Sequence, residues 1–333
     1  MTMLTSCCTS SRSWQGRKAM ARPPLTMAPL PGRSRPVPAL LLLIAAFGVG
    51  CGSTEPSEVG PARLLITAYL PETFVARLYA VNEDGGNLVD LGYGNCGRWS
   101  PQAERIAFAR SPGGSEPTEL YVMRADGRSP RPVPGFVGVG CPAWSPDGDR
   151  IVFLHHGVPD ADAPQEPRLF TVRPDGSDPR DLRVIGDEPA WSPDGEWIAY
   201  ANGGLSVIRP DGSDRRALTS TDPYGSPFHS DPEWTPDGQA LLFVRVEGDQ
   251  PRLFRVNLDG TGLVRLTNDG GYSDESARFS PDGSRMLLLR WQVAPNGAGP
   301  RLFVARPDAT EPVPLTVPTL DGYIFDAAWG PGS

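Results

Sequence analysis

Short apolar runs recur along the chain, and most of them end in a turn-forming sequence. One series reads LYAVNEDG from 78, LYVMRADG from 120, LFTVRPDG from 169, LSVIRPDG from 205, LFRVNLDG from 253 and LFVARPDA from 302. A second series reads RIAFAR from 105, RIVFLH from 150, WIAYAN from 197, ALLFVR from 240 and RMLLLR from 285. Runs of this length bounded by Gly, Pro and Asp predict β-strands, and Asp-Gly supplies the positive φ angles that tight hairpins require.

A third series, GRWSP, AWSPDG, AWSPDG, EWTPDG, RFSPDG and AWGPG, places an aromatic residue at Trp99, Trp144, Trp191, Trp234, Phe279 and Trp329. The steps between these residues are 45, 47, 43, 45 and 50 residues. Self-similarity at this period predicts a propeller or a solenoid. Each repeat is expected to hold four strands: strand a, beginning at the aromatic residue, then b, c and a short d such as RALT from 216. The aromatic residues are expected to pack as wedges between sheets.

The two ends of the chain complete one repeat between them. RLLITAY from 63, RLYAVNEDG from 77 and LVDL from 88 supply strands b, c and d without a preceding strand a, whereas Phe325 to Pro331 supplies a strand a alone. Joining them closes a ring and removes unpaired sheet edges. The sequence therefore predicts an all-β, six-bladed β-propeller of four-stranded antiparallel blades over residues 62–333.

The WSPDG, IAF, LYVM and RLT unit resembles the repeat of TolB and of the WD40-like propellers of bacterial envelopes. The resemblance implies a disc that binds protein segments at one face, and we expect this chain to be a non-catalytic monomer. TolB carries an N-terminal α/β domain before its propeller, whereas this sequence has only the tether of residues 52–61 there. The resemblance is thus to a lipoprotein form without that domain.

The first 50 residues are predicted to be a signal-peptide region that directs export. Eleven apolar residues, 39–49, follow Arg33 and Arg35 and precede Gly50 and Cys51. This is the length of a signal-peptide core and too short for a membrane span. Cys51 after small residues resembles the lipidation site of bacterial lipoproteins, and Met27 gives a better proportioned start. We expect a lipid on Cys51 that anchors the protein to a bacterial membrane, on the periplasmic or cell-surface side; ordinary cleavage to a soluble product is the alternative.

The net charge excludes some partners. The whole chain carries −8 and residues 1–50 carry +6, which leaves −14 on the remainder. Such a body repels phosphate backbones and anionic headgroups, so nucleic-acid binding is excluded and membrane contact should run through the lipid alone. A basic envelope protein or peptide segment is the expected partner.

The loops from b to c and from d to a vary most in length, and both emerge on one face of the ring, which is the candidate binding face. Carboxylates precede strand a there, and we expect a partly solvated rim at the channel mouth: Asp187, Glu188, Asp231, Asp274, Glu275 and Asp326. Surface solubility is the alternative explanation of these acids. The first two repeats carry Cys96 and Cys141 instead, either bridged or as two buried free thiols.

No catalytic, metal or cofactor motif stands out, and the SPDG sequences fit turns better than calcium loops. The leading hypothesis is a non-catalytic, envelope-tethered protein-binding or scaffolding propeller. A metal-assisted sugar lyase or lactonase is the second, because His155, His156 and His229 should share the variable-loop face with carboxylates. Solvated loop histidines are the alternative to that site, and a purely structural lipoprotein is the third hypothesis.

Overall fold

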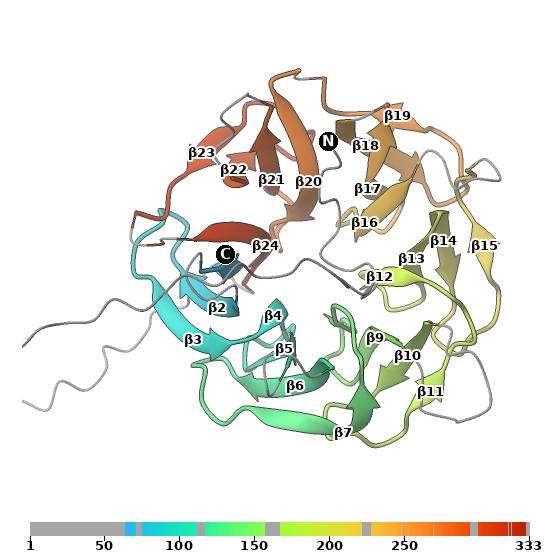
Figure 1. The fold of residues 1–333 in the computed structure, drawn as a ribbon. Helices are drawn as coiled ribbons and strands as arrows, with labels where there is room; N and C mark the ends of the chain where they lie inside the picture. Colours follow the sequence, from blue (N-terminus) through green and yellow to red (C-terminus); the bar gives the residue numbers. More distant parts are fainter. Residues whose placement is uncertain are drawn as a thin grey trace, which may run out of the picture. The chain divides into compact units, whose positions relative to one another are not determined.

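The computed structural model describes residues 64–330, except 71–74, 112–116, 157–166, 222–227, 249, 269, 294–298, 319 and 321. The signal region, Cys51 and the tether lie outside the described residues. The described strands form six four-stranded antiparallel sheets arranged around a central axis (Figure 1). The prediction of an all-β, six-bladed propeller is confirmed.

Strand a of each blade lies nearest the axis and strand d lies at the outer edge (Figure 1). The a strands are β24 (Tyr323–Trp329), β4 (Asn95–Trp99), β8 (Ala143–Trp144), β12 (Asp187–Trp191), β16 (His229–Trp234) and β20 (Tyr272–Phe279). The b strands are β1 (Leu64–Tyr69), β5 (Arg105–Arg110), β9 (Ile151–His155), β13 (Ile198–Asn202), β17 (Ala240–Glu247) and β21 (Met286–Gln292).

The two outer strands of each blade follow. The c strands are β2 (Ala76–Val81), β6 (Glu119–Arg124), β10 (Arg168–Val172), β14 (Gly204–Ile208), β18 (Gln250–Asn257) and β22 (Arg301–Ala305). The d strands are β3 (Val89–Tyr93), β7 (Arg131–Val137), β11 (Arg180–Asp181), β15 (Arg216–Ala217), β19 (Val264–Arg265) and β23 (Val313–Leu315). We number the blades from 1, the blade of β24 and β1–β3, to 6, the blade of β20–β23.

Blade 1 is built from both ends of the propeller. β24 pairs antiparallel with β1, from Leu64 opposite Trp329 to Tyr69 opposite Tyr323. Without β24, the inner edge of β1 would expose unpaired backbone groups. The predicted closure is confirmed.

The core consists of apolar layers between neighbouring blades. Between blades 4 and 5, Leu205 and Val207 of β14 pack with Leu241 and Phe243 of β17, and all four side chains are fully buried. Since both faces of each inner strand pair are covered by neighbouring blades, the b strands read as continuous apolar runs instead of alternating ones.

The SPDG sequences form the turns from strand a to strand b. The Ser145 hydroxyl donates to Asp147 Oδ1 (2.5 Å) and accepts from the Arg150 N–H (2.9 Å), while Gly148 takes a φ of +76°. The carboxylate also accepts from the Asp149 N–H (2.9 Å) and is thereby engaged within its own turn. The turn interpretation of these sequences is supported by this geometry.

The aromatic residues of the repeat end strand a; the prediction that they begin it is wrong. The strand ends at each of these aromatic residues, and after Trp144, Trp191 and Phe279 the chain continues into an SPDG turn. Three indole N–H groups donate to a strand-a carbonyl of the preceding blade: Trp144 to Arg98 (3.0 Å), Trp234 to Ala190 (3.1 Å) and Trp329 to Arg278 (3.0 Å). These bonds confirm the predicted packing between blades.

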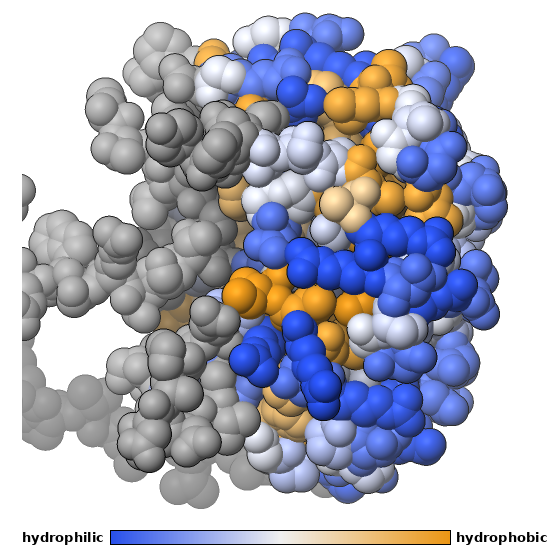
Figure 2. All heavy atoms as spheres, turned by 90° about the vertical axis from the view of Figure 1, so that its right-hand side faces the viewer, coloured by the Kyte–Doolittle hydropathy of each residue, from blue (hydrophilic) through white to orange (hydrophobic). Residues whose placement is uncertain are grey.

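The side of the ring that faces the viewer in Figure 2 is largely hydrophilic, with separate apolar patches between the polar side chains. Leu263 and Val264, near the outer strand of blade 5, are 46% and 48% exposed. Over the part of the chain that the structure describes, no helix is long and apolar enough for a membrane span.

Candidate functional site

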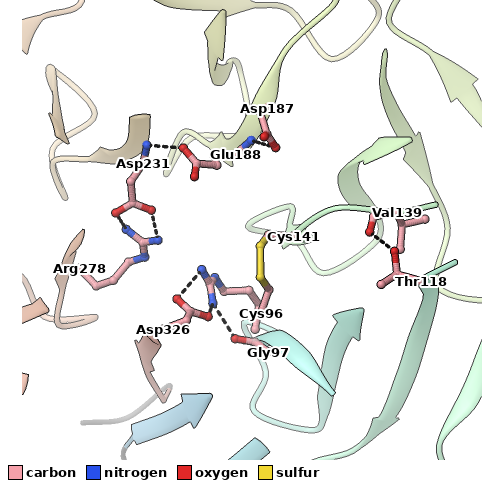
Figure 3. The surroundings of a disulfide bond; sticks show 11 residues. Cys96, Gly97, Thr118, Val139, Cys141, Asp187, Glu188, Asp231, Arg278 and Asp326 are labelled. Atoms are coloured by element: carbon pink, nitrogen blue, oxygen red, sulfur yellow. Dashed lines mark hydrogen bonds and ion pairs between the residues drawn. A yellow bond between two sulfur atoms is a disulfide. The ribbon is translucent and has the colours of Figure 1, made fainter. Parts of the chain in front are cut away.

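Irregular pairing of the inner strands aims side chains into the channel. In β4, β12 and β16 the register with strand b shifts just before the last residues of the strand, as in a β-bulge. Cys96, Glu188 and Asp231, each three residues before the repeat tryptophan, take φ angles of 50–54°. Bulges re-aim side chains and recur next to functional sites. Figure 3 shows Glu188, Asp231, Asp326 and the two cysteines around the centre of the ring.

Two arginines from inner strands hold two of the predicted rim carboxylates. Both Arg278 Nη atoms donate to the Asp231 carboxylate, and Arg98 donates to Asp326 at 2.5 and 3.1 Å (Figure 3 shows the first pair labelled). The side chains of both pairs are less than 20% exposed. Asp231 and Asp326 are therefore parts of shielded ion pairs, and the sequence analysis did not predict their arginine partners.

Three glutamates in the same region have no such bidentate partner. Burial, reinforced by the charges of Asp231 and Asp187, raises the pKa of Glu188 to about 8. Burial also raises the pKa of Glu233 to about 7, although the Arg278 charge opposes this. For Glu275, burial together with the charge of Asp231 raises the pKa to about 7.

These groups form one electrostatic cluster. The Glu188 Oε2 accepts from the Asp231 N–H (2.6 Å), and the Glu233 Oε1 accepts from the Phe279 N–H (3.2 Å). Burial acts to lower the pKa of Arg278, but the Asp231 and Glu233 carboxylates outweigh it and raise this pKa. We call the following set the channel cluster: Asp187, Glu188, Asp231, Glu233, Glu275, Asp326, Arg98 and Arg278. Its carboxylates outnumber its guanidinium groups, so its potential is negative when the glutamates are ionised.

Asp274 is not part of the channel rim, contrary to the sequence expectation. Its side chain is 1% exposed and accepts from Arg290 Nε (2.8 Å). It also accepts from the hydroxyl of Thr267 and from the N–H of Leu253 (3.3 Å), both in blade 5. Adjacent side chains of a strand point to opposite sides, and the partners of Asp274 place it between blades 5 and 6.

Cys96 and Cys141 are joined by a disulfide bond that links blades 2 and 3, with Cα atoms 5.1 Å apart (Figure 3). The sequence left a bridge and two free thiols open, because equivalent side chains around a ring point the same way. The two positions are not equivalent in the structure. Cys96 lies within β4 at a positive φ, whereas β8 begins only at Ala143, so Cys141 precedes its strand. This broken symmetry lets the side chains meet.

The histidines are not brought together. His155 of blade 3 and His229 of blade 5 are each 1% exposed, so the expectation of solvated loop histidines is wrong for both, while His156 is exposed. Burial, with the charge of His156, lowers the pKa of His155. Among the described residues, no group of three or more His, Cys, Asp or Glu side chains is placed to hold a metal ion. The lyase hypothesis gains no support from this geometry.

Sequence reasoning missed three members of the channel cluster: Arg98, Glu233 and Arg278. All three stand directly before the repeat aromatic residue, where blades 1, 3 and 4 carry alanine. The alignment of the repeats could have indicated these residues, because three repeats place a charged side chain where the other three place alanine.

Parts of the variable loops, including residues 157–166 and 222–227, lie outside the described residues. Exposed apolar side chains are nevertheless found where strands meet that face. Trp291 at the end of β21 is 41% exposed, Tyr323 at the start of β24 is 53% exposed, and Phe228 directly before β16 is 45% exposed. This face thus combines exposed aromatic groups with the negative channel cluster.

Comparisons with known proteins agree with this architecture. No family model matches the chain. The Tol-Pal system protein TolB of Bordetella parapertussis is 33% identical over 283 residues, which cover 68% of this chain and 59% of that protein. TolB from Acinetobacter baumannii superimposes with a TM-score of 0.66 at 19% identity, covering 82% of this chain and 68% of that one. An oligogalacturonate lyase from Vibrio parahaemolyticus has a TM-score of 0.51 at 15% identity over 75% and 79% of the two chains.

Six four-stranded blades, one of them built from strands of both ends of the propeller, define a six-bladed β-propeller. Within that class the chain is a TolB-like β-propeller: it is similar to TolB in sequence and shares the propeller fold of TolB structures. It spans 21% to 59% of the lengths of the curated relatives that it matches.

Proposed function

We propose that this protein is a non-catalytic binding propeller of the bacterial envelope, which receives a basic segment of a partner protein at the channel mouth. The observation that carries the proposal is the channel cluster, in which inner strands of several blades aim carboxylates at a common opening. Similarity to a Tol-Pal system protein supports an envelope role. The sequence of residues 39–51 supports export and a lipid anchor on Cys51.

The electrostatics favour a cationic segment over a neutral one. Glu188, Glu233 and Glu275 have raised pKa values, which means that their ionised forms lack sufficient compensation within the protein. A Lys or Arg side chain entering the channel would supply that compensation and would favour proton release from these glutamates. Binding should therefore strengthen as the pH rises from about 6 to about 8.

The aromatic groups on the same face fit a protein partner. Exposed Trp291, Phe228 and Tyr323 provide the large apolar anchors that carry much of the energy of protein interfaces, while charges steer the encounter. A partner segment would contact these anchors first and place its basic side chain in the channel.

The experiment compares two double variants, each with two Glu→Gln replacements, at about pH 9, where Glu188 and Glu275 are ionised because it lies above their raised pKa values of about 8 and about 7. Glu188→Gln with Glu275→Gln neutralises the channel mouth and spares both ion pairs. Glu104→Gln with Glu196→Gln neutralises turns between strands a and b on the opposite face. Each immobilised protein is exposed to envelope extract of the source bacterium at several salt concentrations.

The parent and the turn variant should capture the same protein, with affinity that falls as salt rises. The channel variant should capture at least about tenfold less and lose most of the salt dependence, as expected for loss of charge pairs. Equal capture and equal salt dependence in all three proteins would exclude the channel as the binding site.

The alternative lyase or lactonase hypothesis has a separate test. Metal analysis of the purified protein after chelation and reloading should give no stoichiometric metal under the binding hypothesis. One tightly held metal ion per chain that is lost on His229→Ala would favour the enzyme.

A further inference from the structure

The interface between blades 4 and 5 and the interface between blades 5 and 6 contain the same arrangement of side chains, except that the first has His229 where the second has Asp274. His229 and Asp274 each stand five residues before the repeat aromatic residue of their blade, and Arg245 and Arg290 each stand eleven residues after it. Thr219 and Thr267 end the preceding strand-d sequences, RALT and VRLT. Each threonine hydroxyl accepts a backbone N–H bond, from Leu205 (2.8 Å) and from Leu253 (3.0 Å).

Between blades 5 and 6 the arrangement is complete. Asp274 accepts from Arg290 Nε at 2.8 Å and from the Thr267 hydroxyl, and its side chain is almost fully buried. The guanidinium group of Arg290 also lies over the Phe303 ring, 5.8 Å from its centroid. A buried guanidinium is thus neutralised by a carboxylate that the chain itself supplies.

Between blades 4 and 5 the carboxylate is missing. His229 takes the place of Asp274, and Arg245 lies over the equivalent ring, Phe254, 5.1 Å from its centroid. Among the described residues, Arg245 Nε and His229 Nε2 are both buried and both lack a hydrogen-bond partner. The nearest carboxylate oxygen, on Glu247, is 4.0 Å from Arg245 Nε, and the other oxygen of Glu247 binds Arg265 at 3.2 Å.

Both unpaired atoms are donors in one tautomer of His229. The Thr219 hydroxyl accepts the Leu205 N–H and lies 2.8 Å from His229 Nδ1. In the tautomer in which this hydroxyl donates to Nδ1, as the Thr267 hydroxyl donates to Asp274, the imidazole hydrogen resides on Nε2. Burial, with the charge of Arg245, lowers the pKa of His229 to about 4, so the ring is neutral at physiological pH.

The side chains of His229 and Arg245 line a hollow. A cavity of about 500 Å³ is lined by His229, Arg245, Thr219, Ser220 and the aliphatic side chains of Ala217, Leu218 and Leu263, together with Gly260. Two N–H donors, one of them cationic, require an acceptor group, and an anion satisfies both hydrogen bonding and charge. The aliphatic lining suits an apolar body attached to that group.

We propose that the hollow between blades 4 and 5 binds a small organic carboxylate, whose carboxyl group contacts Arg245 Nε and His229 Nε2 in the place that Asp274 fills between blades 5 and 6. A monocarboxylate is favoured over phosphate, because Glu247 is near and the protein body is strongly acidic. This site lies between blades, apart from the channel cluster, and does not depend on the proposed partner binding. A free aliphatic acid and the C-terminal carboxylate of a peptide share the required chemistry.

The test uses hexanoate as the probe, with hexan-1-ol and inorganic phosphate as controls for the charge and for the apolar body. The chain has only three histidines, so the His229 ring signals can be assigned by NMR after single substitutions. Hexanoate should shift the His229 signals in a saturable manner, and the two control probes should not. An acetylated tetrapeptide ending in leucine, with and without C-terminal amidation, distinguishes the two sources of carboxylate by their relative affinities.

Two variants make the test specific. Arg245→Gln should weaken hexanoate binding at least about tenfold, the loss expected for a charged hydrogen bond, and the exposed control Arg306→Gln should leave it unchanged. His229→Asp should supply the missing carboxylate within the chain, as in blade 6, and abolish hexanoate binding measured by calorimetry. The proposal is overturned if neither hexanoate nor the free-acid peptide binds the parent, or if either binds Arg245→Gln as tightly as the parent.

Discussion

Replacing Glu188 by glutamine should stabilise the protein at alkaline pH and leave its stability nearly unchanged at acidic pH. The carboxyl group of Glu188 is buried beside Asp231 and Asp187, and its pKa rises from 4.5 to about 8. A raised pKa means that the folded protein holds the proton more tightly than the unfolded chain does. The contribution of this group to stability is therefore full below pH 4.5 and is lost as the pH rises toward 8.

The size of the stability change follows from the interval between the ordinary pKa of 4.5 and the folded-state pKa of about 8. Each pH unit between the unfolded and folded pKa values reduces the free energy of unfolding by up to about 1.4 kcal/mol. Because Glu188 shares its environment with Asp231 and Asp187, which also respond to its removal, we expect about 2 kcal/mol of net stabilisation at pH 8. The glutamine oxygen can still accept the Asp231 N–H bond that Glu188 now accepts at 2.6 Å.

The assay is urea unfolding with the disulfide intact, followed by tryptophan fluorescence at pH 4.5, 6 and 8. The difference between Glu188→Gln and the parent should grow from near zero at pH 4.5 to its full size at pH 8, with equal m-values. Glu196→Gln is the matched control, since Glu196 is an exposed residue of a turn paired with Arg209. It should change stability by at most about 0.5 kcal/mol at every pH. A variant less stable than the parent at pH 8, or a difference independent of pH, would refute the reasoning.

Three further predictions concern ring closure, the disulfide bond and the lipid anchor. Removing residues 324–333 deletes most of β24 and leaves β1 with an unpaired inner edge, so the truncated chain should lose cooperative thermal unfolding; melting like the parent would contradict ring closure. Residues 59–333 should show no reactive thiol in denaturant and two after reduction, because Cys96 and Cys141 are bridged, and two thiols before reduction would exclude the bridge. Cys51→Ala should abolish incorporation of labelled fatty acid in growing cells, and undiminished labelling in that variant would rule out Cys51 as the lipid site.

The sequence alone determined the architecture, because each propeller repeat is specified by residues that are close together in the sequence. An apolar run, an Asp-Gly turn and a repeat aromatic residue recur in every unit, and each signal depends on residues a few positions apart. Even the closure between Leu64–Tyr69 and Tyr323–Trp329 could be predicted by counting which strands the two ends lacked. Trp144 was assigned correctly to an interface between blades, although it ends strand a and does not begin it.

Only the tertiary structure decided what the charged side chains do. Glu188 and Asp274 are both acids of strand a, yet Asp274 binds Arg290 between blades, whereas Glu188 lies at the centre of the ring. A slip of one residue in a strand exchanges its two faces, and no local pattern fixes where a bulge falls. Likewise, Arg98 meets Asp326 across 228 residues of sequence, because ring closure brings the first and last repeats together. The repeats set the positions of the strands, whereas the packing between blades set the partners of each charge.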